Sequence, residues 1–232
     1  MQNDTYSRHA RELAEMILPV INQPEYREEF SQIISYLNNW DFTYEIRETA
    51  ASILDVFFVN LARNTLEDEM TPPVYNNFIK LESLPVRTMT RLLKTSEATT
   101  FFDDKTTAET ETREDIIVKS MREAKNYLIR NFGSEPYEWR WENLHTITFE
   151  PLLFSRMEQD SSTGNATRII VNNLFKKGPY PVRGHGMSIN NGQYRWNEPY
   201  EMYLGPSIRS ITDLSDLSYT WSILPTGQSG NP

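Results

Sequence analysis

Residues 45–64 read Glu-Ile-Arg-Glu-Thr-Ala-Ala-Ser-Ile-Leu-Asp-Val-Phe-Phe-Val-Asn-Leu-Ala-Arg-Asn, and this stretch predicts the centre of the fold. Its apolar residues recur with a helical period and cover a broad face, which is typical of a buried helix. The face comprises Ile46, Ala50, Ile53, Leu54, Phe57, Phe58 and Leu61. We expect this helix to be the most buried element of the chain.

Further helical patterns extend on both sides of this stretch, so that residues 1–133 are expected to form a helical region. Pro72-Pro73 breaks the pattern, because proline lacks an amide N–H and clashes with the preceding turn. Thr112 and Asp115 have the spacing of a capping box, and Gly133 is a suitable C-terminal cap for the helix that would follow. The other predicted helices cover residues 7–21, 24–38, 74–80 and 85–94, and the polar residues 95–110 predict an exposed connection.

Beyond Gly133 the apolar period changes from 3.6 toward 2, and glycine, proline and asparagine become more frequent. Residues 134–232 are therefore expected to form a β-rich region. Candidate strands cover residues 144–149, 167–171, 207–213 and 220–224. No linker rich in proline, glycine or serine separates the two regions, so we expect them to belong to one α+β architecture.

Charge and cysteine content exclude several classes of function. The 232 residues include 23 Lys+Arg and 32 Asp+Glu, which gives a net charge of −9 and no basic patch for a nucleic acid. The absence of cysteine excludes disulfides, thiolate nucleophiles and cysteine-ligated metals. The three histidines lack a second ligand at metal spacing, so we expect neither a metal nor another cofactor in this chain.

Membrane and secretory segments are not expected. The longest apolar runs are far shorter than the roughly 20 residues that a membrane-spanning helix needs. The first residues, Met1 to Asp4, have neither the basic nor the apolar part of a signal peptide, and the compartment is not indicated.

One unusual cluster lies at residues 139–152, where Trp139, Trp141 and His145 stand close together. In an extended chain both tryptophans would point to the same side, where they would bury large areas. We expect His145 to bond a neighbouring carbonyl group, and we favour this structural role over direct catalysis.

Two more clusters follow. Residues 176–186, with Arg183 and His185, predict an irregular loop whose glycines allow a close backbone approach or a tight turn. Residues 205–232, with Arg209 and Gln228, predict two strands joined by a polar turn. Ser229 is not expected to be an elbow nucleophile, because Asn231 replaces the second glycine of that motif and no helix or triad partners can follow.

Taken in order, these clusters resemble the C-terminal part of the β-chain of penicillin acylases, which belong to the N-terminal-nucleophile hydrolases. Trp40-Asp41 and Ala50-Ala51 also resemble the helical region of that family. The motifs that carry the resemblance are Trp-x-Trp-x-x-Leu-His-x-x-x-Phe-x-Pro-Leu ending at 152, Gly-Pro-Tyr-Pro-Val at 178–182, Gly-Pro-Ser-x-Arg-x-x-x-Asp-Leu-Ser-Asp at 205–216, and Leu-Pro-Thr-Gly-Gln-Ser-Gly-Asn-Pro at 224–232.

The resemblance implies a helical layer packed beside part of the antiparallel β-sheet sandwich of that superfamily. It also implies a precursor that cleaves itself to release an N-terminal serine, whose α-amine acts as the general base. That serine, the oxyanion-binding asparagine and the calcium-binding carboxylates of the family lie upstream of the part that this chain resembles. We therefore expect no catalytic residue here. The pocket or scaffold candidates are Trp139, Trp141, His145, Arg183, His185, Arg209 and Gln228.

The chain departs from the family pattern at three places. Glu142 stands where the family usually has glycine, and Glu150 stands where it often has histidine. Arg183-Gly184-His185-Gly186 replaces a common Gly-Gly-Asp-Gly turn, so His185 takes the position of an acidic residue. These changes imply different hydrogen bonding in that loop and an altered substrate pocket.

The sequence is thus interpreted as a C-terminal fragment of a penicillin-acylase-like amide hydrolase, a family tied to antibiotic metabolism. The whole enzyme would release an acyl group from a β-lactam nucleus, an acyl-homoserine lactone or a similar amine. Its partners would be the α-chain and the N-terminal part of the β-chain, without which this chain would be inactive and prone to associate. The alternatives are a non-catalytic acylase-like interaction domain and, less favoured, a hydrolase that uses Ser229 or His145.

Overall fold

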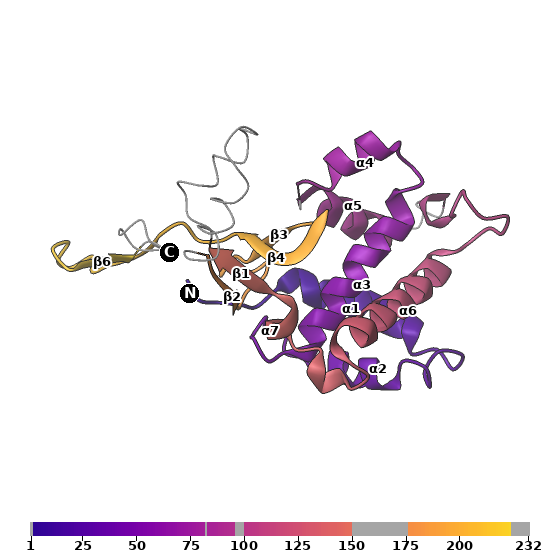
Figure 1. The fold of residues 1–232 in the computed structure, drawn as a ribbon, viewed down its shortest axis with the longest axis horizontal. Helices are drawn as coiled ribbons and strands as arrows, with labels where there is room; N and C mark the ends of the chain where they lie inside the picture. Colours follow the sequence, from indigo (N-terminus) through magenta and orange to yellow (C-terminus); the bar gives the residue numbers. More distant parts are fainter. Residues whose placement is uncertain (1, 82, 96–99, 150–175, 224–232) are drawn as a thin grey trace, which may run out of the picture.

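The computed structural model describes residues 2–81, 83–95, 100–149 and 176–223. Helices dominate the described residues up to Phe132, and the strands all follow His145 (Figure 1). The prediction of an α+β fold is therefore confirmed. The larger helices are α1 (Arg8–Ile21), α2 (Ser31–Asn38), α3 (Thr49–Leu66), α4 (Pro72–Phe78), α5 (Ser83–Lys94) and α6 (Arg113–Phe132).

Helix α3 runs through the middle of the helical body and packs along α6 (Figure 1). Fifteen of its 18 residues are buried, which confirms that the most apolar stretch forms the central helix. Ile46 lies before the observed start of this helix. Five of the buried residues are polar, namely Thr49, Ser52, Asp55, Asn60 and Thr65. A buried carboxylate such as that of Asp55 needs partners inside a protein.

Helix α6 begins at the predicted capping box. The amide N–H of Asp115 donates to Oγ1 of Thr112 (3.2 Å), and the amide N–H of Thr112 donates to the Asp115 carboxylate (2.9 Å). Gly133 follows the helix with φ of 110°, the positive value expected of a glycine there. Its ψ of 171° is outside the left-handed helical region, so the predicted left-handed cap is wrong in detail.

The predicted helix over residues 24–38 is only half correct, because α2 begins at Ser31. The preceding residues form consecutive turns, in which the N–H of Tyr26 bonds to the carbonyl oxygen of Gln23 (3.0 Å). Phe30 still reaches the core, with no exposed surface. The apolar spacing therefore predicted burial correctly, while the turns replace a regular helix.

The strands in the described part of the chain form three two-stranded antiparallel sheets. Strand β1 pairs with β2, β3 with β4, and β5 with β6. Their bounds are β1 (Thr146–Phe149), β2 (Lys177–Pro181), β3 (Gln193–Arg195), β4 (Glu198–Leu204), β5 (Arg209–Thr212) and β6 (Thr220–Ile223). The expected β-sheet sandwich remains a prediction.

Two of the sequence interpretations need correction. Residues 177–181 are a strand rather than an irregular loop, because Ile147 and Tyr180 pair across β1 and β2. Strands β3 and β4 were not predicted at all. The predicted strand over residues 167–171 lies outside the described residues.

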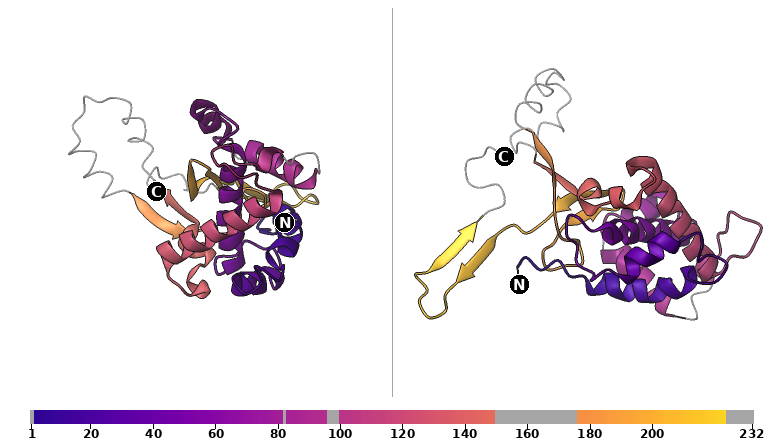
Figure 2. Two further views of the ribbon diagram at one scale, coloured as in Figure 1. Left: turned by 90° about the vertical axis from the view of Figure 1, so that its right-hand side faces the viewer. Right: turned by 90° about the horizontal axis from the view of Figure 1, so that it is seen from below.

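The sheets differ in their position relative to the helical body. Strands β1 and β4 lie side by side next to it, while the β5–β6 hairpin projects away from it (Figures 1 and 2). The 3-10 turn η2 (Pro136–Glu138) and the short helix α7 (Trp141–Leu144) connect α6 to β1. None of the helices in the described residues has the length and hydropathy that a membrane span requires.

Candidate functional site

Four distant segments meet where the helical body joins the strands, at residues 4–7, 42–48, 141–145 and 182–190. Backbone hydrogen bonds connect them pairwise, so that each segment fixes the next. The bonds run from Ser7 N to Phe42 O (2.9 Å), from Gly184 N to Tyr44 O (2.8 Å), from Trp141 N to Glu48 O (3.0 Å) and from Asn190 N to Asp4 O (2.7 Å).

Asp55 of α3 lies at the centre of this junction and is buried. The hydroxyl of Tyr44 donates to its Oδ1 (2.8 Å), and the hydroxyl of Tyr194 donates to its Oδ2 (3.0 Å). Nε2 of His185 lies 3.2 Å from the same Oδ2. Burial by itself would raise the pKa of Asp55, but His185 and the hydrogen bonds outweigh it and lower the pKa below the usual value. The side chain of Asp55 is therefore ionised at neutral pH.

His185 is held in one orientation. Its Nδ1 accepts a hydrogen bond from the amide of Met187 (3.2 Å), so the ring proton is on Nε2 and points to Asp55. The ring stacks on Tyr44 with 4.5 Å between the centroids. The amide of His185 also donates to Oγ of Ser188 (2.9 Å). The family resemblance predicts an acidic residue at this position. His185 takes its place and forms hydrogen bonds that hold the loop.

The backbone conformation and surroundings of Gly184 require a glycine at this position. Its φ is +95°, and a Cβ atom at this position would lie 2.0 Å from the carbonyl oxygen of Asn190. Both a positive φ and a close backbone approach are therefore required here.

His145 lies in the same cluster with no exposed surface. Its Nδ1 lies 2.6 Å from the carbonyl oxygen of Tyr200, to which it donates, as expected of this histidine. Its Nε2 has no hydrogen-bond partner among the described residues, and a Cβ atom on Gly192 would lie 2.7 Å from it. The ring stacks on Trp141 at 4.5 Å. Burial lowers the pKa of His145 to about 4, so the ring is neutral at neutral pH.

The expectation that Trp139 and Trp141 share one side of an extended chain is wrong. Trp139 follows η2, and its Nε1 donates to the carbonyl oxygen of Gly133 at the end of α6 (2.8 Å). Trp141 is the first residue of α7, and its Nε1 donates to the carbonyl oxygen of Gly184 (3.2 Å). Both rings are buried, but they hold different parts of the junction.

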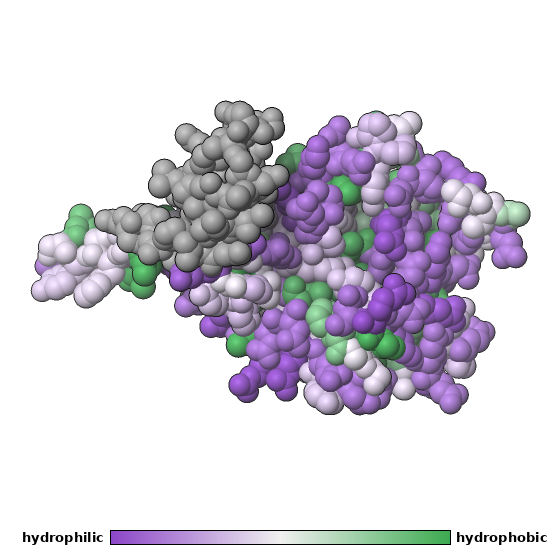
Figure 3. Space-filling view, in the orientation of Figure 1, coloured by the Kyte–Doolittle hydropathy of each residue, from purple (hydrophilic) through white to green (hydrophobic). Residues whose placement is uncertain are grey.

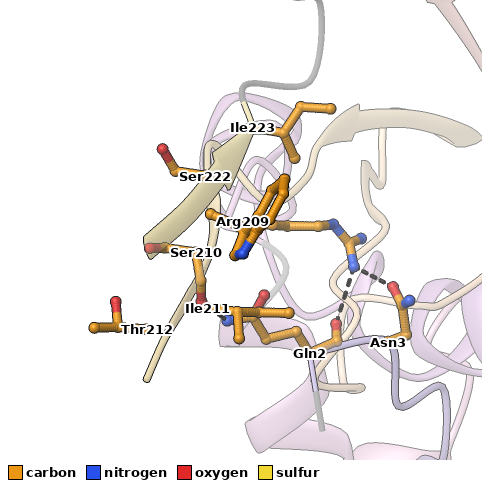
Figure 4. A pocket seen from close by; sticks show the side chains of 9 residues that line it. Gln2, Asn3, Arg209, Ser210, Ile211, Thr212, Ser222 and Ile223 are labelled. Atoms are coloured by element: carbon orange, nitrogen blue, oxygen red, sulfur yellow. Dashed lines mark hydrogen bonds between the residues drawn. The ribbon is translucent and has the colours of Figure 1, made fainter. Parts of the chain in front are cut away.

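The two arginine candidates lie outside the buried cluster. Nη2 of Arg183 lies 2.6 Å from Oε1 of Glu45 at the exposed rim. Arg209 begins the hairpin and donates to the carbonyl oxygen of Gln2 and to the side chain of Asn3 (Figure 4). Gln228, like Glu150 and Ser229, lies outside the described residues.

Asp55, Tyr44 and Tyr194 were not among the predicted site residues. An available signal was the aspartate in the middle of the most apolar helix, because a buried carboxylate must be paired or protonated. Nothing in the sequence indicated which hydroxyls would bond to it.

The two histidines of the cluster are shielded from solvent and make hydrogen bonds within the chain. A general base must come within hydrogen-bond distance of the proton that it removes, yet 0% of His145 and 6% of His185 are exposed. The described residues also contain no group of three or more His, Cys, Asp or Glu side chains that could hold a metal ion.

The fold and the cluster define an α+β protein in which histidines and tryptophans tie a helical body to small antiparallel sheets. The chain belongs to the penicillin amidase family, whose profile matches residues 1–232. It is similar to the acyl-homoserine lactone acylase QuiP of Pseudomonas aeruginosa, with 24% identity over 219 residues that make up 93% of this chain and 25% of that protein.

Two further relatives carry the same name. The protein of Pseudomonas syringae pv. syringae is 22% identical over 218 residues, which are 93% of this chain and 25% of that protein. The protein of Pseudomonas putida is 22% identical over an alignment of 246 positions, which covers 100% of this chain and 28% of that protein. The chain therefore spans about a quarter of the length of these relatives.

Proposed function

We propose that this chain forms the C-terminal part of the β-chain of an amide hydrolase of the penicillin amidase family. The observation that carries the proposal is that the family profile covers the whole chain, while the acylases that it resembles are about four times as long. The names of those relatives favour an N-acyl-homoserine lactone as the substrate class. A β-lactam with an amide side chain is the second substrate to test.

In this proposal the nucleophile is an N-terminal serine on polypeptide outside this chain. Its hydroxyl oxygen attacks the amide carbonyl and its own α-amine, with a pKa near 8, accepts the proton. The amine product leaves, and water then cleaves the acyl-serine ester to release the acid. This division of work fits the junction, in which His145 and His185 are shielded by bonds to other parts of the chain.

The role that remains for this chain is that of a scaffold. Asp55 lies on the central helix, while His185 and Tyr194 come from the loop and strand that follow the helical body. Their contacts fix the strands against α3, and fixed supporting elements are what a precise catalytic site requires.

Complementation tests the proposal. The purified chain is assayed with an N-acyl-homoserine lactone, alone and after co-expression with the polypeptide that supplies the rest of the acylase. We expect hydrolysis only in the second case, and its loss when the N-terminal serine of the partner is changed to alanine. Hydrolysis by the chain alone would contradict the proposal, and a complex that is inactive on both substrate classes would favour a non-catalytic domain.

A further inference from the structure

His145 holds a strained residue of strand β4 in place. Tyr200 has φ of +83°, a region that a bulky side chain rarely occupies and that persists where the surroundings enforce it. Its carbonyl oxygen accepts the Nδ1–H of His145 (2.6 Å), and its ring packs against Tyr194 and Tyr127, with 5.5 and 5.7 Å between the ring centroids. The position of β4 therefore depends on the ring of His145.

The ring of His145 has no place for a second proton. Its Nδ1 donates to Tyr200, so Nε2 carries the lone pair. Nε2 has no hydrogen-bond partner among the described residues, the whole residue is buried, and Gly192 lies directly against this atom. A proton on Nε2 would create a buried cation whose N–H has no acceptor, which is costly in a protein interior. The protonated ring therefore has to leave this position.

The charged groups that face His145 do not change this conclusion. Asp55 of α3 favours a proton on His145, and His185 of the adjacent loop disfavours it. Burial outweighs the attraction of Asp55 and lowers the pKa of His145 to about 4. A proton on His185 would strengthen its attraction to Asp55 and thus act toward the closed junction. The other titratable groups are the phenols of Tyr44, Tyr194 and Tyr200, which stay neutral in acid, and, further away, His9 of α1, Arg63 of α3 and Tyr127 of α6.

Segment 182–204, which contains β3 and β4, adds little to the apolar core. Within the part of the chain that the structure describes, three buried apolar side chains follow Leu144, namely Tyr194, Trp196 and Tyr200. The rest of the core lies at or before Leu144, and the surface of the helical body is mostly hydrophilic on the face that Figure 3 shows. The helical body can therefore stay folded while this segment opens as a local unit.

We propose that segment 182–204 is an acid-released latch. When His145 takes up a proton, its ring leaves the position beside Tyr200 and Gly192, and the segment detaches from α3 and α6 while the helices stay folded. This inference goes beyond the proposed function and does not depend on it, because every group involved lies in this chain.

Hydrogen exchange of the full 232-residue chain, followed by mass spectrometry, tests the latch. The amides of Gly184 and Asn190 bond across the junction to Tyr44 and Asp4, so their exchange reports its opening. With a pKa of 6.5 in the open state and about 4 in the closed state, a proton on His145 raises the opening equilibrium about twentyfold between pH 7.0 and pH 5.0. We expect this rise for residues 182–204, after correction for the intrinsic effect of pH on exchange.

Helix α6 distinguishes local release from unfolding of the whole chain. At pH 5.0, we expect residues 182–204 to exchange about tenfold faster, or more, than residues 116–128 of α6. Low concentrations of urea should accelerate the exchange of residues 182–204 less than that of α6, because local opening exposes less surface than global unfolding.

His145→Gln and His9→Gln form a matched pair of variants. Glutamine at position 145 can still donate to Tyr200 but takes up no proton, so the acid rise in segment 182–204 should fall from about twentyfold to less than about threefold. The half-buried His9 contacts Thr90 of α5 within the helical body (3.1 Å), so His9→Gln should keep most of the rise. Circular dichroism checks that both variants retain their helices.

Three results would overturn the proposal. They are an acid rise below about threefold in the wild type, equal exchange of residues 182–204 and α6 at pH 5.0, and an undiminished rise in His145→Gln. Loss of the rise in His9→Gln would assign the proton to the helical body and would also overturn it. If His145→Gln fails to fold, the wild-type comparison of the two segments still decides.

Discussion

At Asp55, donors from three separate segments converge on one buried carboxylate. Tyr44 precedes the central helix, His185 lies in the loop after β2, and Tyr194 lies in β3. Each hydrogen bond to a charged group contributes about 1.5 to 3 kcal/mol, and a buried donor without a partner costs a similar amount. The stability of the junction should therefore depend strongly on this one side chain.

Asp55→Asn tests that dependence. The amide can still accept from Tyr44, but its NH₂ group would face the donors of Tyr194 and His185. We expect the free energy of unfolding in urea to fall by about 3 kcal/mol. Glu15→Gln, which removes only an exposed ion pair with Arg11, serves as the control and should change it by less than about 1 kcal/mol. Similar effects of the two substitutions would contradict the account of Asp55.

His145 makes stability depend on pH. Burial lowers its pKa from 6.5 to about 4, so between these values the unfolded chain binds a proton that the folded chain does not. The free energy of unfolding should therefore decrease as the pH falls through this window, by up to about 1.4 kcal/mol per pH unit from this group. The half-buried His9, whose pKa burial also lowers to about 4, acts in the same direction. The lowered pKa of Asp55 acts only below its ordinary value of 3.8.

Urea unfolding at pH 6.5 and pH 4.5 measures this dependence. His145→Gln should show a smaller loss of stability between the two pH values than the wild type, and His9→Gln provides an independent second variant. A wild-type slope that neither substitution reduces would show that other groups control the acid response.

Local partners of the buried groups could be predicted from the sequence, whereas distant partners could not. The buried carbonyl bond of His145 was foreseen because a lone histidine beside a strand commonly has such a partner. The pairing of Asp55 with His185 was not, because the two residues are 130 positions apart and only the folded chain brings them together.

At the scale of single elements, local chemistry predicts best where it is self-contained. The capping box of α6 lies within four residues, and the structure contains both of its reciprocal bonds. Strand β2 is the opposite case, because Gly178 and two prolines are unusual in strands and its pairing depends on β1. The two tryptophans were misplaced for a related reason, since short turns at 136–144 replace the expected extended chain.

The cap of α6 provides a quantitative test. Thr112→Ala removes the side chain that bonds Asp115, and we expect a loss of about 1 kcal/mol in the free energy of unfolding. Thr110→Ala, at an exposed position just before the helix, should be close to neutral. If both variants unfold at the same urea concentration as the wild type, the cap contributes nothing to the stability of the whole chain.

At the scale of the whole molecule, buried acid–base groups contrast with an exposed apolar hairpin face. The potential acid–base groups of the junction are turned inward and bonded to the chain itself, while the apolar face of the β5–β6 hairpin, formed by Ile211, Trp221 and Ile223, is turned to solvent. The chain covers about a quarter of the length of its acylase relatives. Buried acid–base groups are consistent with our proposal that the catalytic serine lies on polypeptide outside this chain. The family resemblance favours this proposed division, but the exposed apolar face of the hairpin could be recognised only from the strand register and the exposure of its side chains.

Labelling of the nucleophile shows which polypeptide carries the catalytic serine. The complemented, active enzyme is treated with a serine-reactive sulfonyl fluoride until hydrolysis stops, and the modified peptide is identified by mass spectrometry. We predict one modified serine, at the N-terminus of the partner polypeptide, and none in residues 1–232. A modified serine within this chain, Ser229 included, whose labelling parallels the loss of activity would contradict this prediction.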